Sequence, residues 1–539
     1  MKLTAFCFYD ACRKHGSKQY LNRKIIPRVE HAGDKDNTKG EFMYQPKLPE
    51  FEAFARRGNL IPVYREVLAD IETPVSVLKK LQHKDHVYLL ESVEGGEKWG
   101  RYSFIGTDAG VVFKVRGPKV IVEEKGRVSE RDHKGDPLNA MRELLSRYKP
   151  VSMPGLPRFF GGAVGYLGYD MVRYFEKLPD APPDDLNLDE SVFVISDSLV
   201  IFDNTRHTIK VVACAYTEDS DSAEEAYEAA CRKIDEMISL LAAPAASPAP
   251  EPKANGVAFE SNMTPDQYKA IVEKARGYIA AGDVIQVVLS QRFSTPCQTD
   301  PVDLYRALRY VNPSPYLFFL KLDDLTMIGS SPEVMVRLEQ TDVELRPIAG
   351  TRKRGKTEQE DRALADELLS DEKERAEHVM LVDLGRNDLG RIAESGSVQV
   401  NQYMVVEKYS HVMHLVSNVR AQLAKGKDAF DVLAATFPAG TLTGAPKVRA
   451  MQIIDELEPL RRGPYGGAVG YFSFNGNMDL CITIRTMVIK DGKIFVQAGA
   501  GIVYDSQPDS EHQETLNKAR GMQMAVKLAA GGFVLENGN

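Results

Sequence analysis

GGAVGY occupies residues 161–166, and the same six letters return at residues 466–471. A β-rich run follows each copy: SLVIFDNTRHTIKVVACA at 198–215 and DLCITIRTMVIKDGKIFVQAGAGIVY at 479–504. The turn pairs Asp203-Asn204 and Asp491-Gly492 interrupt these runs, so each run predicts a β-hairpin. A strand pattern that repeats together with its hairpin indicates an internal duplication.

Helical patterns flank these strands without alternating regularly with them. Apolar residues recur at helical spacing in 265–281, 358–369, 372–384 and 510–528. Regular alternation would predict βαβ units and a parallel sheet, whereas this grouping predicts an α+β fold. We expect a core of two sheets packed as a β-sandwich, with flanking helices.

Composition excludes several classes of protein. The chain has 539 residues, which is too long for one ordinary domain. Its composition, 43% apolar and 27% charged, is that of a globular protein. Its 68 basic and 76 acidic residues are intermixed, which argues against a nucleic-acid partner. No apolar run approaches the roughly 18 to 20 residues of a membrane span. Six scattered cysteines without a C-x-x-C pair argue against disulfides and zinc and favour a reducing cytoplasm.

Changes in composition divide the chain. Residues 1–46 are polar and without periodicity, so we expect an extension of low order, with Met43 as the hypothetical initiator. An Ala-, Pro- and Ser-rich stretch at 243–256 predicts an exposed linker. We therefore expect an N-terminal domain at 47–242 and a second domain at 257–533.

The stretch GTRKRGKT at 350–357 matches the P-loop pattern letter for letter. A P-loop opens a helix whose N-terminus faces phosphate. Here Glu358, Glu360 and Asp361 follow at once, which would place carboxylates at the anion site. We reject the nucleotide-binding interpretation.

A carboxylate is expected on an apolar helix face. In helical register Glu377 shares a stripe with Met380 and Leu384, the face that should be buried. A lone buried carboxylate is costly. Protonation, a salt bridge with Arg386 or Arg391, or a metal ion would each neutralise it, and the spacing alone leaves these alternatives open.

Four other features are less specific. The acidic residues of 509–514 begin a helix, where they usually form only a solvated first turn. The glycine-rich segment 497–501 indicates a tight turn or a backbone that binds an anion. His414 alternates with apolar residues, as a core histidine or a catalytic one would. Arg485 lies inside a strand of β-branched residues and needs a carboxylate or phosphate partner, from the protein or from a substrate.

Eleven motifs in order resemble the chorismate-utilising enzymes, and among them the large components of anthranilate synthases. The resemblance runs from about Phe51 to Leu528. The motifs are LLESVEGGEKWGRYSFIG, NPSPYLFF, IGSSPEVMV, RPIAGTRKRG, AEHVMLVDLGRNDLGR, YSHVMHLVS, FPAGTLTGAPK, GPYGGAVGYF, ITIRT, QAGAGIVYDS and EHQETLNKAR.

The resemblance implies a role for several residues. Glu377 and Glu514 would bind Mg2+, which holds the ring carboxylate of chorismate. Glu333 would be the general acid, and His414 would act in the later elimination of pyruvate. The residues implied to bind chorismate are Gly350, Thr351, Tyr465, Arg485, Gly499, Ala500 and Gly501.

Two positions distinguish this chain from related enzymes. By the resemblance, Gln286 stands at the position where isochorismate and salicylate synthases carry a lysine that activates water. Ala349 stands where aminodeoxychorismate synthases typically carry a nucleophilic lysine. Without either lysine, the resemblance implies direct amination of chorismate by ammonia.

The resemblance also implies regulation. Ser92, with its neighbour Glu91, and the run Pro315, Tyr316 and Leu317 resemble the tryptophan feedback site. For Glu91 and Ser92, the alternative interpretation is ordinary strand packing. Ser92 substitution should weaken inhibition while sparing the uninhibited rate.

The implied activity is that of a lyase which converts chorismate and ammonia to anthranilate and pyruvate in tryptophan biosynthesis. We expect a separate glutaminase subunit, component II, to supply the ammonia, because no glutaminase motif is recognisable. The alternatives are an aminodeoxychorismate synthase component I and an inactive tryptophan-sensing subunit. The roles of Lys447 and Lys518 stay open.

Overall fold

The computed structural model describes residues 44–68, 71–92, 100–107, 110–244, 257–409 and 412–534. The stretch from Met43 to Asn539 forms one compact unit. The expected extension at 1–46 lies almost wholly outside the described residues, and so does most of the expected linker at 243–256.

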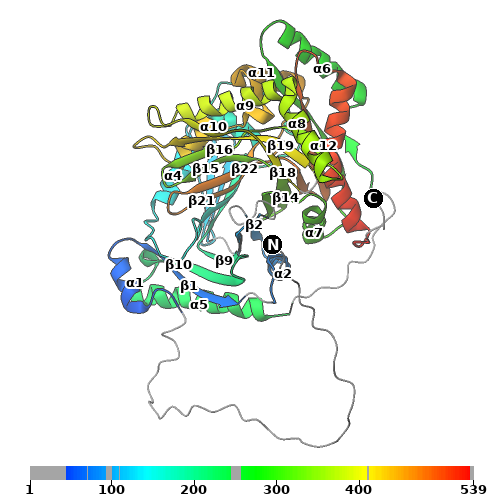
Figure 1. Ribbon diagram of the computed structural model, residues 1–539. Coiled ribbons are helices and arrows are strands. Elements are labelled where there is room, and N and C mark those ends of the chain that lie inside the picture. The colour runs from blue at the N-terminus through cyan, green and yellow to red at the C-terminus, as the bar shows by residue number, and fades with distance from the viewer. Residues whose placement is uncertain are drawn as a thin grey trace, which may run out of the picture. The chain divides into compact units, whose positions relative to one another are not determined.

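Two large antiparallel sheets form the core of this unit (Figure 1). Within the described residues, sheet A has 12 strands in the order β1-β10-β9-β3-β2-β13-β14-β23-β24-β12-β11, with β20 paired to β12. Their bounds are β1 Leu60–Leu68, β2 His86–Glu91, β3 Tyr102–Thr107, β9 Ser198–Asp203, β10 Thr208–Tyr216, β11 Glu260–Ser261, β12 Gln286–Pro296, β13 Tyr316–Leu322, β14 Leu325–Ser331, β20 Gly444–Ala445, β23 Thr486–Lys490 and β24 Lys493–Ile502.

Sheet B, again among the described residues, has 12 strands in the order β17-β19-β16-β15-β22-β21-β7-β8-β4-β5-β6, with β18 paired to β19. Their bounds are β4 Val111–Arg116, β5 Lys119–Glu124, β6 Arg127–Asp132, β7 Gly162–Leu167, β8 Ser191–Ser196, β15 Val334–Glu339, β16 Asp342–Leu345, β17 Ile348–Lys353, β18 Gln399–Lys408, β19 Val412–Gln422, β21 Ala468–Ser473 and β22 Met478–Ile482.

The strand order repeats on the two sides of a junction in each sheet. In sheet A the first segment of the chain meets the second where β2 pairs with β13, and in sheet B where β7 pairs with β21. Reading outward from both junctions, strands β1 to β10 correspond in order to β12, β13, β14, β15, β16, β19, β21, β22, β23 and β24. This correspondence supports the expected internal duplication.

The two GGAVGY strings are hydrogen-bonded neighbours. They form β7 and β21, and Gly165 lies directly opposite Gly470. A Cβ on Gly165 would lie 1.9 Å from the carbonyl oxygen of Val192 on the neighbouring strand, so the backbones leave room only for glycine there. The repeated string therefore marks the place where the two segments of the chain join in sheet B.

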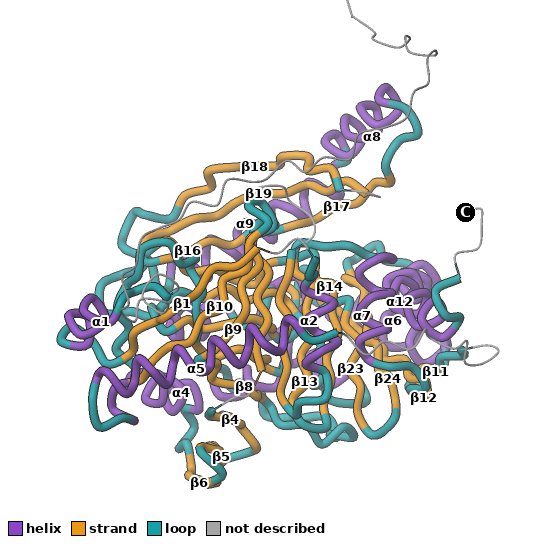
Figure 2. The backbone as a smooth tube through the Cα atoms, turned by 90° about the horizontal axis from the view of Figure 1, so that it is seen from below, coloured by secondary structure: helices purple, strands orange, loops and turns teal. Residues whose placement is uncertain are grey.

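Helices cover the outer faces of both sheets. Beneath sheet A, α5 and α2 run across the strands, and α6, α7 and α12 gather beside β12, β23 and β24 (Figure 2). Helices α8, α9 and α10 contact sheet B. The helical bounds are α1 Leu48–Ala55, α2 Pro74–Leu81, α4 Pro137–Ser146, η1 Tyr169–Tyr174, η2 Thr217–Asp219, α5 Ala223–Ala242, α6 Pro265–Ala280, α7 Pro301–Val311, α8 Glu358–Ser370, α9 Glu372–Gly390, α10 Ala429–Thr436, η3 Gly440–Leu442, α11 Lys447–Leu457 and α12 Pro508–Ala530.

The largest apolar cluster fills the space between the sheets. Phe193 of sheet B packs on Phe472 with ring centroids 5.5 Å apart, and Phe104 of sheet A packs on Phe159 at 5.2 Å. A second cluster lies between sheet A and its helices. The predicted two-sheet α+β sandwich is confirmed.

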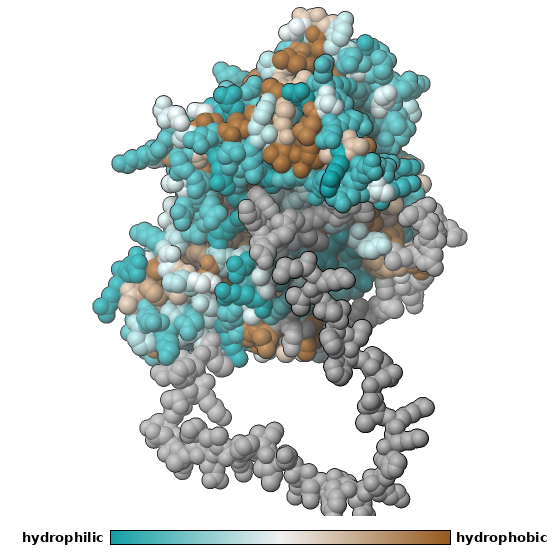
Figure 3. Space-filling model, in the orientation of Figure 1, coloured by the Kyte–Doolittle hydropathy of each residue, from teal (hydrophilic) through white to brown (hydrophobic). Residues whose placement is uncertain are grey.

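The surface agrees with the composition. On the face shown in Figure 3, hydrophilic residues predominate and apolar residues form small separate areas. In the part of the chain that the structure describes, no helix is both long enough and apolar enough to cross a membrane.

Local sequence signals explain the element boundaries. The four predicted helices form as α6, α8, α9 and α12, and α9 continues to Gly390, beyond its expected end. Thr264, Thr357 and Asp371 cap the first three, each side chain accepting a backbone N–H of the first turn. The predicted hairpins form as well, with Asp491-Gly492 in the left-handed region between β23 and β24.

Candidate functional site

Glu333 and Arg485 lie on two crossovers between the sheets. Glu333 stands between β14 of sheet A and β15 of sheet B, and Arg485 between β22 of sheet B and β23 of sheet A. The amide of Ile482 donates to the carbonyl of Glu333 at 3.0 Å, and that of Ser330 donates to the carbonyl of Arg485 at 3.1 Å. The two crossovers therefore run side by side and bring both side chains to one end of the sandwich.

The position of Arg485 corrects one expectation. The sequence places it within a strand, but it occupies the crossover, with a φ of 51° that is uncommon for a residue other than glycine. Its Nη1 donates to the carbonyl of Lys518 at 3.3 Å. No described residue forms a salt bridge with it, and burial lowers the pKa of its guanidinium. A partly buried arginine without an ion pair is suited to an anionic ligand.

The carboxyl of Glu333 holds a proton near neutral pH. Burial raises its pKa from 4.5 to about 7, and the charge of Glu377 adds to the rise. Thr441, Lys518 and Arg485 lie close enough to oppose that rise. This carboxyl can thus donate a proton at neutral pH, which an ordinary glutamate cannot do.

Two further carboxylates approach this site from α9 and α12. Burial raises the pKa of Glu377, and the charges of Glu374 and Glu514 raise it further. No described residue forms a salt bridge with Glu377, because Arg386 pairs with Asp383 and Arg391 with Glu176. Of the alternatives that the sequence left open, protonation and a bound metal ion are therefore the two that this arrangement permits.

Lys518 connects the features of this site, and sequence reasoning did not assign it a role. Its Nζ lies 2.7 Å from Glu514 and donates to the carbonyl of Gly499 at 3.0 Å. Its charge lowers the pKa of both Glu333 and Glu377. The four-residue spacing from Glu514 on a predicted helix was the available signal.

Lys447, the other lysine left open, has a different setting. Its Nζ lies 2.8 Å from Asp388, and both side chains are largely buried. Burial raises the pKa of Asp388 while the lysine opposes that rise. Lys447 therefore neutralises a buried carboxylate that joins α11 to α9.

Among the described residues, no group of three or more His, Cys, Asp or Glu side chains has an arrangement that could hold a metal ion. Glu377 and Glu514 are two carboxylates and fall below that number. A hard divalent cation such as Mg2+ keeps several waters and shares substrate oxygens, so a pair of protein carboxylates suffices for it.

The glycine-rich segment is part of a strand. Gly499 and Gly501 belong to β24 and pair with Ser290 and Val288 of β12. The tight turn that was one interpretation of this segment is therefore excluded. Ala500 faces the opposite side and packs in the apolar cluster of α6 and α11, so its backbone alone borders the site.

Both glycines allow side chains to approach closely. A Cβ at Gly499 would lie 2.9 Å from the hydroxyl of Tyr465, and one at Gly501 would lie 2.5 Å from Nε2 of Gln286. Burial raises the pKa of the Tyr465 hydroxyl, while Arg485 and the Gly499 backbone oppose the rise. This glycine strand, Tyr465 and Gln286 form one wall of the site.

His414 lies on β19, opposite Thr351 of β17. Its Nδ1 lies 2.9 Å from the carbonyl oxygen of Gly350 and 3.1 Å from the hydroxyl of Thr351. Burial lowers the pKa of the imidazole, and the positive charge of Arg485 lowers it further. With Nδ1 donating to the carbonyl, Nε2 is left as a neutral proton acceptor.

The P-loop letters of 350–357 do not bind phosphate here. The amides of Gly355 and Lys356 donate to the carboxylates of Asp361 and Glu360, at 2.9 and 2.8 Å. Arg354 pairs with the same Asp361. The protein's own carboxylates occupy the anion position, as the sequence indicated.

A cavity lies between the sheets. It measures about 550 Å³, open mouth included, and its lining contains all four residues of the expected tryptophan site: Ser92, Pro315, Tyr316 and Leu317. They meet because the end of β2 pairs with the start of β13, at the junction of sheet A. Arg337 and Asp479 also line this cavity and form a 3.0 Å ion pair.

Comparison with known proteins identifies the family of this chain. Residues 90–524 match the family model for chorismate binding enzymes. The chain belongs to this family. It is similar to "Anthranilate synthase component 1" of Aquifex aeolicus (strain VF5), 50% identical over 496 residues, covering 89% of this chain and 98% of the relative. The protein of that name from Acetivibrio thermocellus is 48% identical over 493 residues, covering 90% and 99%.

Solved structures of chorismate binding enzymes have the same fold. Anthranilate synthase component I from Streptococcus pneumoniae TIGR4 matches with a TM-score of 0.72 at 40% identity, covering 85% of this chain and 98% of that one. The menaquinone-specific isochorismate synthase of Escherichia coli matches with a TM-score of 0.65 over 88% and 98%, and at 19% identity it shows the fold alone. The family expected from the motifs is confirmed.

Proposed function

We propose that this chain converts chorismate and ammonia to anthranilate, pyruvate and water, as the large component of an anthranilate synthase. The observation that carries the proposal is Glu333, a buried carboxyl with a pKa of about 7 beside Arg485 and near Glu377. Around one substrate, such a site combines a proton donor, a fixed positive charge and carboxylates for a cation. The relatives named anthranilate synthase component 1 support the same activity.

We propose Mg2+ as the cofactor, held by Glu377 and Glu514. Carboxylate oxygens are the donors that Mg2+ prefers, and these two come close enough for the charge of Glu514 to raise the pKa of Glu377. A divalent cation would relieve this repulsion. When bound, Mg2+ would anchor and polarise the ring carboxylate of chorismate.

Glu333 would protonate the C4 hydroxyl of chorismate while ammonia adds at C2. The hydroxyl then leaves as water, and the ring keeps the new amino group. A carboxyl with a pKa near 7 is protonated in a large fraction of molecules at neutral pH, as this step requires.

His414 would take the C2 proton as pyruvate leaves and the ring becomes aromatic. Its Nδ1 is turned to the carbonyl of Gly350, so Nε2 is the nitrogen available to the substrate. The lowered pKa keeps the imidazole neutral at physiological pH, in the form that accepts a proton.

The remaining implied residues would bind chorismate. Arg485 offers a guanidinium without an ion pair among the described residues, and Tyr465 offers a buried hydroxyl. Gly350, Thr351 and the Gly499–Gly501 backbone lie on strands that border these side chains. We propose that this set holds the carboxylates and the enolpyruvyl group.

The product assignment rests on two positions. Gln286 is buried against Gly501 with an uncharged amide, so this position offers no lysine to activate water. Ala349 of β17 is also buried and has no nucleophile. Direct attack by ammonia fits both residues.

We also propose that tryptophan inhibits the enzyme from the cavity between the sheets. The cavity is lined by aromatic residues and by charged ones, which suits an amino acid with an indole side chain. Because it lies where the two segments of the chain meet, a ligand there can favour one packing of the sheets over another. A preference of a few kcal/mol suffices for strong inhibition.

A separate glutaminase subunit is proposed to supply ammonia, since the relatives are named as one component of a larger enzyme. A reducing cytoplasm is proposed as the compartment. It agrees with the four described cysteines, Cys214, Cys231, Cys297 and Cys481, which are all free.

The test is an assay of the purified chain with chorismate, Mg2+ and ammonium chloride at alkaline pH. Anthranilate fluorescence and pyruvate should both appear without any glutaminase. Aminodeoxychorismate in place of anthranilate would assign the chain to the alternative activity, and no product would indicate a binding subunit.

The metal assignment has its own test. Glu377→Gln and Glu514→Gln should each lower kcat/KM by about 100-fold or more and abolish the rise in melting temperature that Mg2+ produces. Glu372→Gln, on the first turn of α9, is the matched control and should keep both. Retention of the Mg2+ effect in both site variants would contradict the assignment.

A further inference from the structure

An ion pair lies buried behind the wall formed by Tyr465 and the glycine strand. The side chains of Glu458 and Arg462 are 3% and 1% exposed. Nη2 of Arg462 lies 2.7 Å from Oε1 of Glu458, and Nε lies 2.9 Å from Oε2. The pair stands at the end of α11, just before Tyr465.

Glu458 fastens the pair to β12. Its Oε1 accepts hydrogen bonds from the amide and the hydroxyl of Ser290, at 2.7 and 2.8 Å. Ser290 lies directly opposite Gly499, one of the glycines of the proposed chorismate site. The carboxylate thus holds β12 at the place where β24 borders the substrate.

Arg462 holds two other backbone segments. Its Nη2 donates to the carbonyl of Val288, opposite Gly501, and its Nη1 donates to the carbonyl of Leu442, both at 2.7 Å. Leu442 follows Thr441, which lies beside Glu333. One guanidinium therefore ties β12, the strand that pairs with the glycine strand, to the short helix η3 next to the proposed acid.

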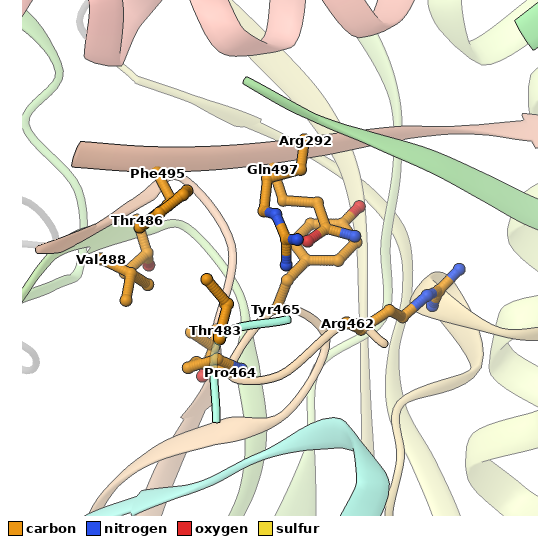
Figure 4. Close-up of a pocket in the computed structure, with 10 residues that line it drawn as sticks. Arg292, Arg462, Pro464, Tyr465, Thr483, Thr486, Val488, Phe495 and Gln497 are labelled. Atoms are coloured by element: carbon orange, nitrogen blue, oxygen red, sulfur yellow. The ribbon is translucent and has the colours of Figure 1, made fainter. Parts of the chain in front are cut away.

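The same guanidinium also packs against aromatic rings. Its Cζ lies 5.6 Å from the ring centroid of Tyr465 and 4.7 Å from that of Tyr169. In Figure 4, Arg462 and Tyr465 lie together on one side of a pocket whose other side is formed by Thr486, Val488 and Phe495.

We propose that Glu458 and Arg462 are positioning residues that fix Tyr465, the glycine strand and η3 relative to one another, and so set the geometry of the substrate site. The inference rests on the proposed function, because it concerns the same site. Each member of the pair also bonds backbone groups that border the substrate site, so the pair does more than neutralise its own two charges.

The experiment replaces both members together, by Glu458→Leu with Arg462→Met. The melting temperature should fall, because Ser290 and the carbonyls of Val288 and Leu442 lose their partners. In the protein that stays folded, kcat/KM for chorismate should fall by about 100-fold. The fall should include a higher KM, which a mere decrease in the folded fraction would not produce. A folded double variant with wild-type kcat and KM would overturn the proposal.

A second comparison uses conservative changes at two arginines whose carboxylate partners lie in the last turn of α11 or at its C-cap. Arg173 forms a forked ion pair with Asp455 of α11, at 2.9 and 2.8 Å, one turn before Glu458 and away from Tyr465. Arg462→Lys and Arg173→Lys each replace a fork by a point charge. We expect the first to lower kcat/KM at least about tenfold and the second to leave it unchanged.

This comparison decides the question even if the double variant fails to fold. Equal effects of the two lysine substitutions on kcat/KM would overturn the proposal. They would show that the loss of either forked ion pair near the end of α11 lowers activity to the same extent. Wild-type protein that makes no anthranilate would instead refute the proposed function, so the two failures are distinguishable.

Discussion

The ammonium group of Lys518 lies 2.7 Å from a carboxylate oxygen of Glu514, one turn earlier on α12. The same group donates to the carbonyl of Gly499 and lowers the pKa of Glu377. A positive charge therefore already acts on both carboxylates that we propose as Mg2+ ligands. In the protein without metal, Lys518 neutralises part of the charge that the cation would neutralise.

Removal of this lysine should strengthen Mg2+ binding. In Lys518→Gln, measured without chorismate by calorimetric titration, we expect the Kd for Mg2+ to fall about fivefold, since a partly exposed ion pair contributes up to about 1 kcal/mol. Lys527→Gln, on an exposed turn of the same helix, is the control and should leave the Kd unchanged. Weaker binding in Lys518→Gln would show that the lysine supports the metal site.

Glu333 should make stability depend on pH. Its folded pKa of about 7 lies above its ordinary value of 4.5, so the folded protein binds a proton that the unfolded chain releases. The stabilisation that this proton gives the folded protein is fully present below pH 4.5 and is lost as the pH rises through 7. Above that pH the stability no longer changes through Glu333. The cost of the charged form at pH 8 is of the order of 3 kcal/mol.

Glu333→Gln removes this titration. Relative to the wild type, the variant should gain free energy of unfolding between pH 5 and pH 8 in urea titrations made without metal or substrate. Glu339→Gln, at the exposed end of β15, provides the reference. A stability difference that is the same at both pH values would mean that Glu333 titrates normally.

Ser92→Ala should relieve tryptophan inhibition. The residue lines the cavity between the sheets, and the proposed acid Glu333 is not part of that lining. The inhibition constant should rise about tenfold, as for the loss of one hydrogen bond to a charged group, with kcat unchanged. Ser129→Ala, on exposed β6, should have no effect. Unaltered sensitivity in Ser92→Ala would place the tryptophan site elsewhere.

The two strand glycines should tolerate alanine unequally. A Cβ at Gly499 would meet the carbonyl oxygen of Leu289 at 2.8 Å, and backbone cannot yield cheaply. A Cβ at Gly501 would meet only the flexible end of Gln286. Gly499→Ala should therefore lose about 1 to 3 kcal/mol of stability, and Gly501→Ala much less. Thermal melts of the two variants measure this difference, and equal losses would contradict the described packing.

Local pattern sufficed for much of the fold. Helices α6, α8, α9 and α12 and the hairpin at Asp491-Gly492 follow from periodicity and turn chemistry, both of which are read within a few residues. The pairing partners of each strand cannot be predicted from these local patterns. Pairing of β2 with β13 joins segments far apart in the chain, and an alternating pattern does not encode its neighbour.

Among the site residues too, local sequence marks some and not others. Glu377 stood out because a carboxylate on an apolar face contradicts its surroundings, whereas Glu333 was found only through resemblance, since nothing local marks a residue between two strands. Arg485 was placed in a strand because its β-branched neighbours conceal the crossover. Thr441 and Lys518 acquire their surroundings from tertiary structure, so their roles were not read from the sequence.

The paired strings of β7 and β21 have a consequence for biosynthesis. When the ribosome has released only the first half of the chain, β2 and β7 have no partners on one side, and two sheets present open edges at once. Unpaired edges are templates for association with other chains. The nascent protein must keep these edges apart until β13 and β21 emerge, and a chain cut at residue 244 would retain both edges.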